Sequence, residues 1–204
     1  MLKDIFYSLA IRYTHNATSL KLWAEIETAY SSKKRKYHNL AHLQNMYDSL
    51  LECKDSAEDW DTLLFALFYH DIVYKATGKD NEEKSANIAV KHLAAMHYPA
   101  AKAAKCHALI MATKHHIAST DIDTALLTDA DMAILGTDWE VYENYYKAVR
   151  KEYAIYPDFL YNPGRAKVLK HFLGMESLYS TKVFKEKFEA KARENICREL
   201  QIIT

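Results

Sequence analysis

The chain has 204 residues, 50% of them hydrophobic and 26% charged, which is the composition of an ordinary globular protein. Lysine plus arginine and aspartate plus glutamate number 27 each, so the overall charge does not favour a nucleic-acid or membrane partner. Only four glycines and three prolines are present, which is too little turn chemistry for many hairpins and favours helices joined by polar loops.

The cysteines and the apolar segments favour a soluble protein of a reducing compartment. Cys53, Cys106 and Cys197 are odd in number and widely separated, which predicts buried free thiols. The N-terminal segment carries an acidic residue and no long apolar core, so we expect no signal peptide. No apolar run approaches the ~20 residues that span a bilayer. We therefore expect a cytoplasmic protein.

Apolar periodicity and helix start and stop signals predict an all-α fold of about nine or ten helices with no significant sheet. The basic run at 33–36 is expected to be a solvated loop. We expect one domain over 1–204, with a core at about 37–136 on which helices of 137–204 pack. The expected helices are two within 2–31 that break near His15, then about 39–53, a buried helix ending at 70–71, 80–97, 100–116, 126–135 ended by Gly136, 137–153, 162–174 opened by Asn162-Pro163, and one from about Ser180.

The central feature is the stretch 63–74, in which ten of twelve residues are apolar or aromatic and the other two are His70 and Asp71. A run that is apolar on every face predicts a helix buried all round. A buried aspartate needs a positive partner, and a metal ion shared with His70 would meet that need. From this stretch alone, an aspartate held by an arginine or by backbone N–H groups is the favoured interpretation.

Two other helices carry polar residues among apolar ones. His42 lies on the flank of an apolar stripe, and Asp131 shares a helix face with Leu127, Ala130 and Ile134. Asp129, the alternative acidic residue, lies well round the same helix. Together with His70 and Asp71, His42 and Asp131 would give two imidazoles and two carboxylates, which suit a hydrolytic metal.

This ordered set resembles the HD-domain superfamily of metal-dependent phosphohydrolases, whose pattern is H…HD…D on a helical core. Ala130-Asp131 corresponds to the Ala-Asp commonly found at the last ligand. The resemblance implies a divalent ion (Mn, Fe, Mg, Zn, Ni or Co, one or two ions) bound by His42, His70, Asp71 and Asp131. It extends to a subgroup described as predicted metal-dependent HD phosphohydrolases, through the segments 37–42, 70–74, 80–86, 113–116 and 129–131.

The segment Tyr37-His38-Asn39 followed by His42 is also similar to the Tyr-His-Asn-x-x-His segment of cyclic-nucleotide phosphodiesterases. In those enzymes the second histidine is a ligand and the first donates a proton to the leaving oxygen. Leu43-Gln44-Asn45 departs from the phosphodiesterase continuation. The similarity implies that His38 is a candidate general acid or phosphate contact, and His38 lies one helical turn before His42.

Further polar residues are candidates for a second metal or for phosphate contacts. His115 and His116 could extend the site, as extra histidines do in some HD proteins. Equally, Lys114, His115 and His116 could form a cationic helix C-terminus. Glu82 could contact a metal-bound water, whereas a capping box of Asp80 with Glu83 accounts for Glu83. We expect the other histidines (15, 92, 97, 107 and 171) to be structural.

These features predict a phosphomonoesterase or phosphodiesterase that hydrolyses a small phosphorylated metabolite, with a nucleotide as the expected class. A divalent ion acidifies a bound water, and Asp71 would orient that water or bridge two ions. The alternatives are a sensor module that binds metal and nucleotide without turnover, a di-iron oxygenase, and a helical interaction protein without metal. We expect neither a nucleic-acid polymer nor a membrane as partner. The sequence leaves the oligomeric state open, and a homodimer is one alternative.

Overall fold

The computed structural model describes residues 1–115 and 119–204, and within these ranges every regular element is a helix. This confirms the predicted all-α fold of about ten helices. The helices are α1 (Leu2–Ala10), α2 (Asn16–Tyr30), α3 (Leu40–Leu51), α4 (Trp60–Tyr69), α5 (Asn81–Ala95), α6 (Ala100–Ala112), α7 (Ile122–Met132), α8 (Trp139–Glu152), α9 (Asp158–Gly174) and α10 (Lys182–Ile203), with short 3-10 helices η1 (Lys54–Ser56) and η2 (Ala133–Gly136).

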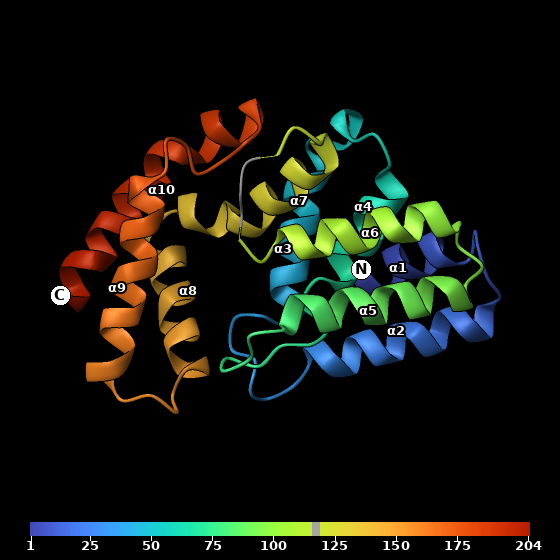
Figure 1. Ribbon diagram of the computed structural model, residues 1–204, viewed down its shortest axis with the longest axis horizontal. Helices are drawn as coiled ribbons and strands as arrows, with labels where there is room; N and C mark the ends of the chain where they lie inside the picture. Colours follow the sequence, from blue (N-terminus) through green and yellow to red (C-terminus); the bar gives the residue numbers. More distant parts are fainter. Residues whose placement is uncertain (116–118) are drawn as a thin grey trace.

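Helix α4 is the centre of a bundle formed by α1–α7 and contacts α3, α5, α6 and α7 (Figure 1). It begins where the carboxylate of Asp59 accepts the backbone N–H of Thr62. Every residue from Thr62 to Tyr69 is buried, because the helix presents apolar side chains on all sides. The predicted buried helix is therefore confirmed, and its C-terminal end places His70 and Asp71 inside the bundle.

Helices α8, α9 and α10 form a second group, the α8–α10 layer, on one side of the bundle (Figure 1). The layer meets the bundle at η2, which contacts both α8 and α10. The helix expected to run to 135 ends at Met132 as α7 and continues as η2, whose last residue, Gly136, does not have a left-handed backbone. A β-carbon at Gly136 would lie 2.5 Å from the β-carbon of Phe188 on α10, so glycine is required here for close approach.

The expected start of α9 at Asn162-Pro163 is wrong, because the helix begins at Asp158. The carbonyl of Pro157 accepts the backbone N–H groups of both Leu160 and Tyr161, which closes the first turn before Pro163 is reached. Pro163 then lies inside the helix, where its missing N–H removes one backbone hydrogen bond.

The capping box expected at Asp80 and Glu83 is also wrong. Asp80 precedes the first residue of α5, but its side chain caps no backbone N–H and forms an ion pair with Lys84 at 2.8 Å. The backbone of Asp80 has ψ 23°, outside the extended region that directs an N-cap side chain toward the helix. Asn81 instead bonds both backbone groups of Lys75 and closes the 75–81 loop.

The cysteine prediction is confirmed for Cys53 and Cys106, which are free and buried. It is wrong for Cys197, which is free and exposed because it lies on the outer face of α10. Among the residues that the structure describes, no helix has the length and apolar character needed to cross a bilayer.

Candidate metal centre

Three elements of the α1–α7 bundle bring His42, His70 and Asp131 together. His42 Nε2 lies 3.3 Å from His70 Nε2 and 3.2 Å from Asp131 Oδ1. One potential ligand atom from each of the three lies within 4.8 Å of the other two. His42 comes from α3, His70 follows α4, and Asp131 belongs to the last turn of α7. We call these three residues the metal cluster.

The geometry of His70 is that of a metal ligand whose tautomer is fixed by the protein. Its Nδ1–H donates to the carbonyl oxygen of Leu67 at 2.8 Å, which leaves Nε2 facing the cluster. Burial opposes protonation of this ring, but the carboxylates of Asp71 and Asp131 outweigh burial and raise the pKa of His70 to about 9. For His42, burial dominates and lowers the pKa. The carboxylates of Asp71 and Asp131 therefore favour positive charge at His70, whereas His42 is held in its neutral form.

Asp71 lies at the edge of the metal cluster, with its Oδ2 3.4 Å from His70 Nε2. Its backbone is held from two sides, since its N–H donates to Tyr30 Oη and its carbonyl accepts from Arg35. Arg35 thus contacts the backbone carbonyl of Asp71 and not its carboxylate, so the alternative in which an arginine holds the carboxylate is not found among the described residues. Burial raises the pKa of Asp71, but the His70 charge and hydrogen bond outweigh it and lower the pKa to about 2.

The cluster fits a divalent ion by donor type and by spacing. Ligand atoms at about 2.0–2.2 Å from one ion lie about 3.0–3.4 Å from one another in common geometries. The separations of His42 Nε2 from His70 Nε2 and Asp131 Oδ1, 3.3 and 3.2 Å, fall in this range. Two imidazole nitrogens that face each other at this distance need a proton or a cation between them. A mixed nitrogen and oxygen set accepts several divalent metals.

Asp129 and Asp131 lie on different sides of α7 and make different contacts. Asp129 is fully buried and its carboxylate accepts the backbone N–H groups of Ser180 and Thr181 and the Thr181 hydroxyl. Asp129 therefore anchors residues 180–181 just before α10, whose N-cap is Thr181. Asp131 is partly exposed and lies against His42. The apolar helix face of Asp131, from which the sequence favoured it over Asp129, thus lies toward the cluster, although Asp129 is the more buried of the two carboxylates.

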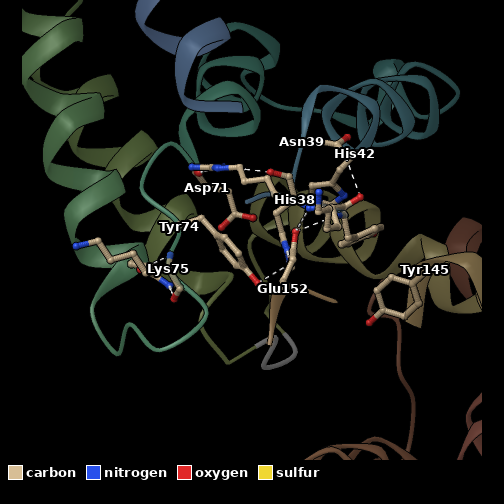
Figure 2. A network of polar contacts seen from close by, with 12 residues as sticks. His38, Asn39, His42, Asp71, Tyr74, Lys75, Tyr145 and Glu152 are labelled. Carbon is tan, nitrogen blue, oxygen red and sulfur yellow. Dashed lines mark hydrogen bonds and ion pairs between the residues drawn. The ribbon is translucent and has the colours of Figure 1, made fainter. Parts of the chain in front are cut away.

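His38 lies beside the cluster, and its ring is held by Glu152, which the sequence did not single out, and by two tyrosines (Figure 2). Its Nδ1 is 2.6 Å from Glu152 Oε2 of α8, and its ring stacks on Tyr74 at a centroid distance of 4.1 Å. Tyr37 packs edge-on against His38, and the ring centroids lie 4.9 Å apart. Glu152 is 114 positions from His38, so only the tertiary fold could have identified it.

Arg35 is buried, although the basic run at 33–36 was expected to be a solvated loop. Its guanidinium donates to the carbonyl oxygens of His38, Asp71 and Ile72 and lies over the ring of Tyr30. It joins the loop before α3 to the segment after α4. Arg35 therefore fixes the two segments that carry His38 and Asp71.

The remaining candidates do not join the metal cluster within the described part of the chain. Lys114 and His115 are exposed beyond the end of α6, and Lys114 Nζ donates to the carbonyl of Lys79 at 3.1 Å. Glu82 is half-buried in the first turn of α5. His116 lies outside the described residues.

A small cavity of about 160 Å³ adjoins the cluster on the side of α3. Tyr37 and His42 line it together with Asn45 and Ser49, and side chains of η2, α8 and α10 close it. Tyr37 also packs on Tyr145 of α8 at a ring-centroid distance of 4.6 Å. Aromatic side chains from both regions of the molecule therefore surround the centre.

A scan of the chain against protein-family models finds no matching family, and searches of curated proteins and of solved structures find no match.

Proposed function

We propose that the chain is a metal-dependent phosphohydrolase of the HD type that acts on a small phosphorylated metabolite. The observation that carries the proposal is the convergence of His42, His70 and Asp131, with Asp71 beside them, from three separate elements. The ordered H…HD…D pattern of the sequence supports it independently of the geometry.

The proposed ligands are the metal cluster and Asp71. A bound divalent ion would acidify a water molecule and polarise a phosphoryl oxygen. The chain's own groups would do the rest. The carboxylate of Asp71 would accept a hydrogen bond from the attacking water, and His38 would give a proton to the departing oxygen.

Several aromatic side chains lie beside the centre and suggest a substrate class to test. Tyr37 and Tyr145 pack together beside His42, and Tyr74 packs on His38. Aromatic side chains stack on nucleobases without selecting among them. A nucleotide is therefore the first substrate class to test, either as a monoester or as a cyclic or linear diester.

The test is phosphate release from a panel of nucleotides and other phosphoesters with Mn²⁺ added, comparing the wild type with Asp71→Asn. The matched control is Asp61→Asn at the opposite end of α4, because the two carboxylates are similarly exposed, 15% for Asp71 and 16% for Asp61. We expect the wild type and Asp61→Asn to release phosphate, and Asp71→Asn to lose at least about 100-fold in kcat.

Two results would contradict the proposal in different ways. If the wild type binds Mn²⁺ but releases phosphate from no compound, the centre is a binding site and the sensor alternative replaces the enzyme. If the metal content is the same in the wild type and in a His70→Ala variant, the metal assignment itself is wrong.

A further inference from the structure

Glu152 is a buried carboxylate that serves two segments far from it in sequence. Its side chain is 1% exposed. Oε1 accepts the backbone N–H groups of Lys36, Tyr37 and His38 at 2.6, 2.8 and 3.1 Å. Three consecutive N–H groups aimed at one oxygen form a nest that fixes where that oxygen lies.

The second oxygen of Glu152 faces the candidate general acid. Oε2 accepts the Tyr74 hydroxyl at 2.8 Å and lies 2.6 Å from Nδ1 of His38 (Figure 2). A carboxylate can only accept, so Nδ1 of His38 must carry a proton in this arrangement. The ring of Tyr74 stacks on the His38 imidazole, and the two rings are inclined by 24°.

Within residues 1–115 and 119–204, the other ring nitrogen of His38, Nε2, has no hydrogen-bond partner. Nε2 is not a buried atom, and without a protein partner it is accessible to solvent. The ring lies edge-on to His42, and the two ring centroids are 5.8 Å apart. The contacts of Glu152 and Tyr74 therefore use one side of the ring and leave the other available beside the centre.

We propose that Glu152 is a positioning residue that holds the proton on Nδ1 of His38 and so presents Nε2 to the departing oxygen of the substrate. This inference rests on the proposed phosphohydrolase function. In the reaction, His38 would give its Nε2 proton to the leaving oxygen as the phosphorus–oxygen bond breaks, while the Nδ1 proton remains on the hydrogen bond to Glu152. The α8–α10 layer would then contribute to catalysis by positioning His38, although all proposed metal ligands lie in the bundle.

The substitution Glu152→Gln tests this because the nest fixes the orientation of the new amide. The three backbone N–H groups require the glutamine oxygen at the Oε1 position, so its NH₂ group must face His38 and Tyr74. Nδ1 of His38 would then meet a donor and must become an acceptor, which moves the proton of the neutral ring to Nε2. Such a ring cannot act as an imidazolium acid.

The first measurement is the ¹⁵N spectrum of the imidazole of His38 in the full chain loaded with Zn²⁺, assigned with a His38→Asn variant. We expect the protonated nitrogen to be Nδ1 in the wild type and Nε2 in Glu152→Gln. Asp123→Asn is the matched control, since Asp123 is an equally buried carboxylate that accepts two backbone N–H groups elsewhere, from Glu58 and Asp59. An unchanged proton position in Glu152→Gln would overturn the inference, whether or not the protein hydrolyses phosphoesters.

The second measurement is a double-mutant cycle in kcat. We expect Glu152→Gln and His38→Asn each to lower kcat by about 100-fold, with KM changed by less than about threefold. The double variant should be no slower than His38→Asn alone. If Glu152→Gln lowers kcat by the same factor in both backgrounds, Glu152 only braces the loop and the inference is wrong. Failure of the wild type to turn over any substrate would reject the proposed function alone.

Discussion

The α1–α7 bundle and the α8–α10 layer are held by different kinds of contact. The bundle is built around an apolar helix, α4. Burial of its side chains stabilises the bundle through the hydrophobic effect, which is non-directional. The layer contributes fewer residues to the hydrophobic core and adds buried polar contacts, such as Asn195 to the carbonyls of Leu135 and Thr137. Hydrogen bonds are directional, so these contacts fix the orientation of the layer relative to the bundle.

This difference explains how one site draws on both regions. The metal cluster lies among α3, α7 and the end of α4, where apolar packing holds the proposed ligands at fixed separations. Glu152 reaches the same site from α8 through hydrogen bonds alone. The bundle therefore supplies the proposed metal ligands, and the layer supplies the group that orients the proposed acid.

The largest expected effect concerns two aspartates of α7 that lie two residues apart and serve different regions. We expect Asp131→Asn to weaken Mn²⁺ binding by more than about 100-fold, because loss of a ligand exceeds the usual 10–100-fold cost of losing a ligand's hydrogen-bond partner. Asp129→Asn should keep the metal and lower the free energy of unfolding by about 1–3 kcal/mol, because its amide would face donors. Mass spectrometry measures the metal content of each variant, and urea denaturation measures its free energy of unfolding. Equal metal loss in both variants would contradict the assignment.

A second large effect is expected inside the layer, where Arg165 of α9 is paired with Glu199 of α10 at 2.7 Å and both side chains are buried. Arg165→Met should lower the free energy of unfolding by about 3–5 kcal/mol, because it leaves the Glu199 charge buried and unpaired. Urea denaturation followed by circular dichroism measures this. The double variant Arg165→Met with Glu199→Leu should recover most of the loss. A loss below about 1 kcal/mol in the single variant would show that the pair does not stabilise the layer.

The stability that Glu152 contributes by joining the layer to the bundle should depend on pH. Burial of Glu152 favours its neutral form, but the His38 hydrogen bond and charge, the Tyr37 N–H and the Tyr74 hydroxyl outweigh burial and lower its pKa to about 2. A pKa lowered in the folded state gives stability that is present above the unfolded pKa, near 4.5, and is lost as pH falls toward 2.

The wild type should therefore exceed Glu152→Gln in free energy of unfolding by about 2–3 kcal/mol at pH 6, and the difference should shrink steadily at pH 4.5 and 3.5. Urea denaturation at the three pH values tests this. A difference that stays constant would mean that the charge of Glu152 does not carry the link.

The smallest expected effect compares two glycines. Gly136→Ala should destabilise the protein by about 1–3 kcal/mol, because the added β-carbon meets Phe188 where η2 and α10 touch. Gly164→Ala in α9 should stabilise it by about 0.5–1 kcal/mol, because nothing lies within 4 Å of the new β-carbon and the backbone is helical. Thermal denaturation should show a lower Tm for Gly136→Ala and a higher Tm for Gly164→Ala than for the wild type. Destabilisation by Gly164→Ala would contradict this comparison.

Several helix boundaries could be predicted because they depend on local chemistry. The buried helix before His70, the break between α1 and α2, and the start of α3 near Asn39 all follow from neighbouring residues. The start of α9 could not, because proline at 163 suggested a boundary that the carbonyl of Pro157 had already set. Asp80 likewise has the sequence of an N-cap without its backbone conformation.

The sequence by itself determined the all-α fold, the buried helix that ends in His70 and Asp71, and the identity of the candidate ligands, because periodicity and residue type are local properties of the chain. Only the tertiary structure decided that Asp129 anchors the segment before α10, that Arg35 is buried, and that Glu152 holds His38. These outcomes depend on which elements meet across more than thirty positions, and a buried charge is tolerated wherever donors from another segment converge on it.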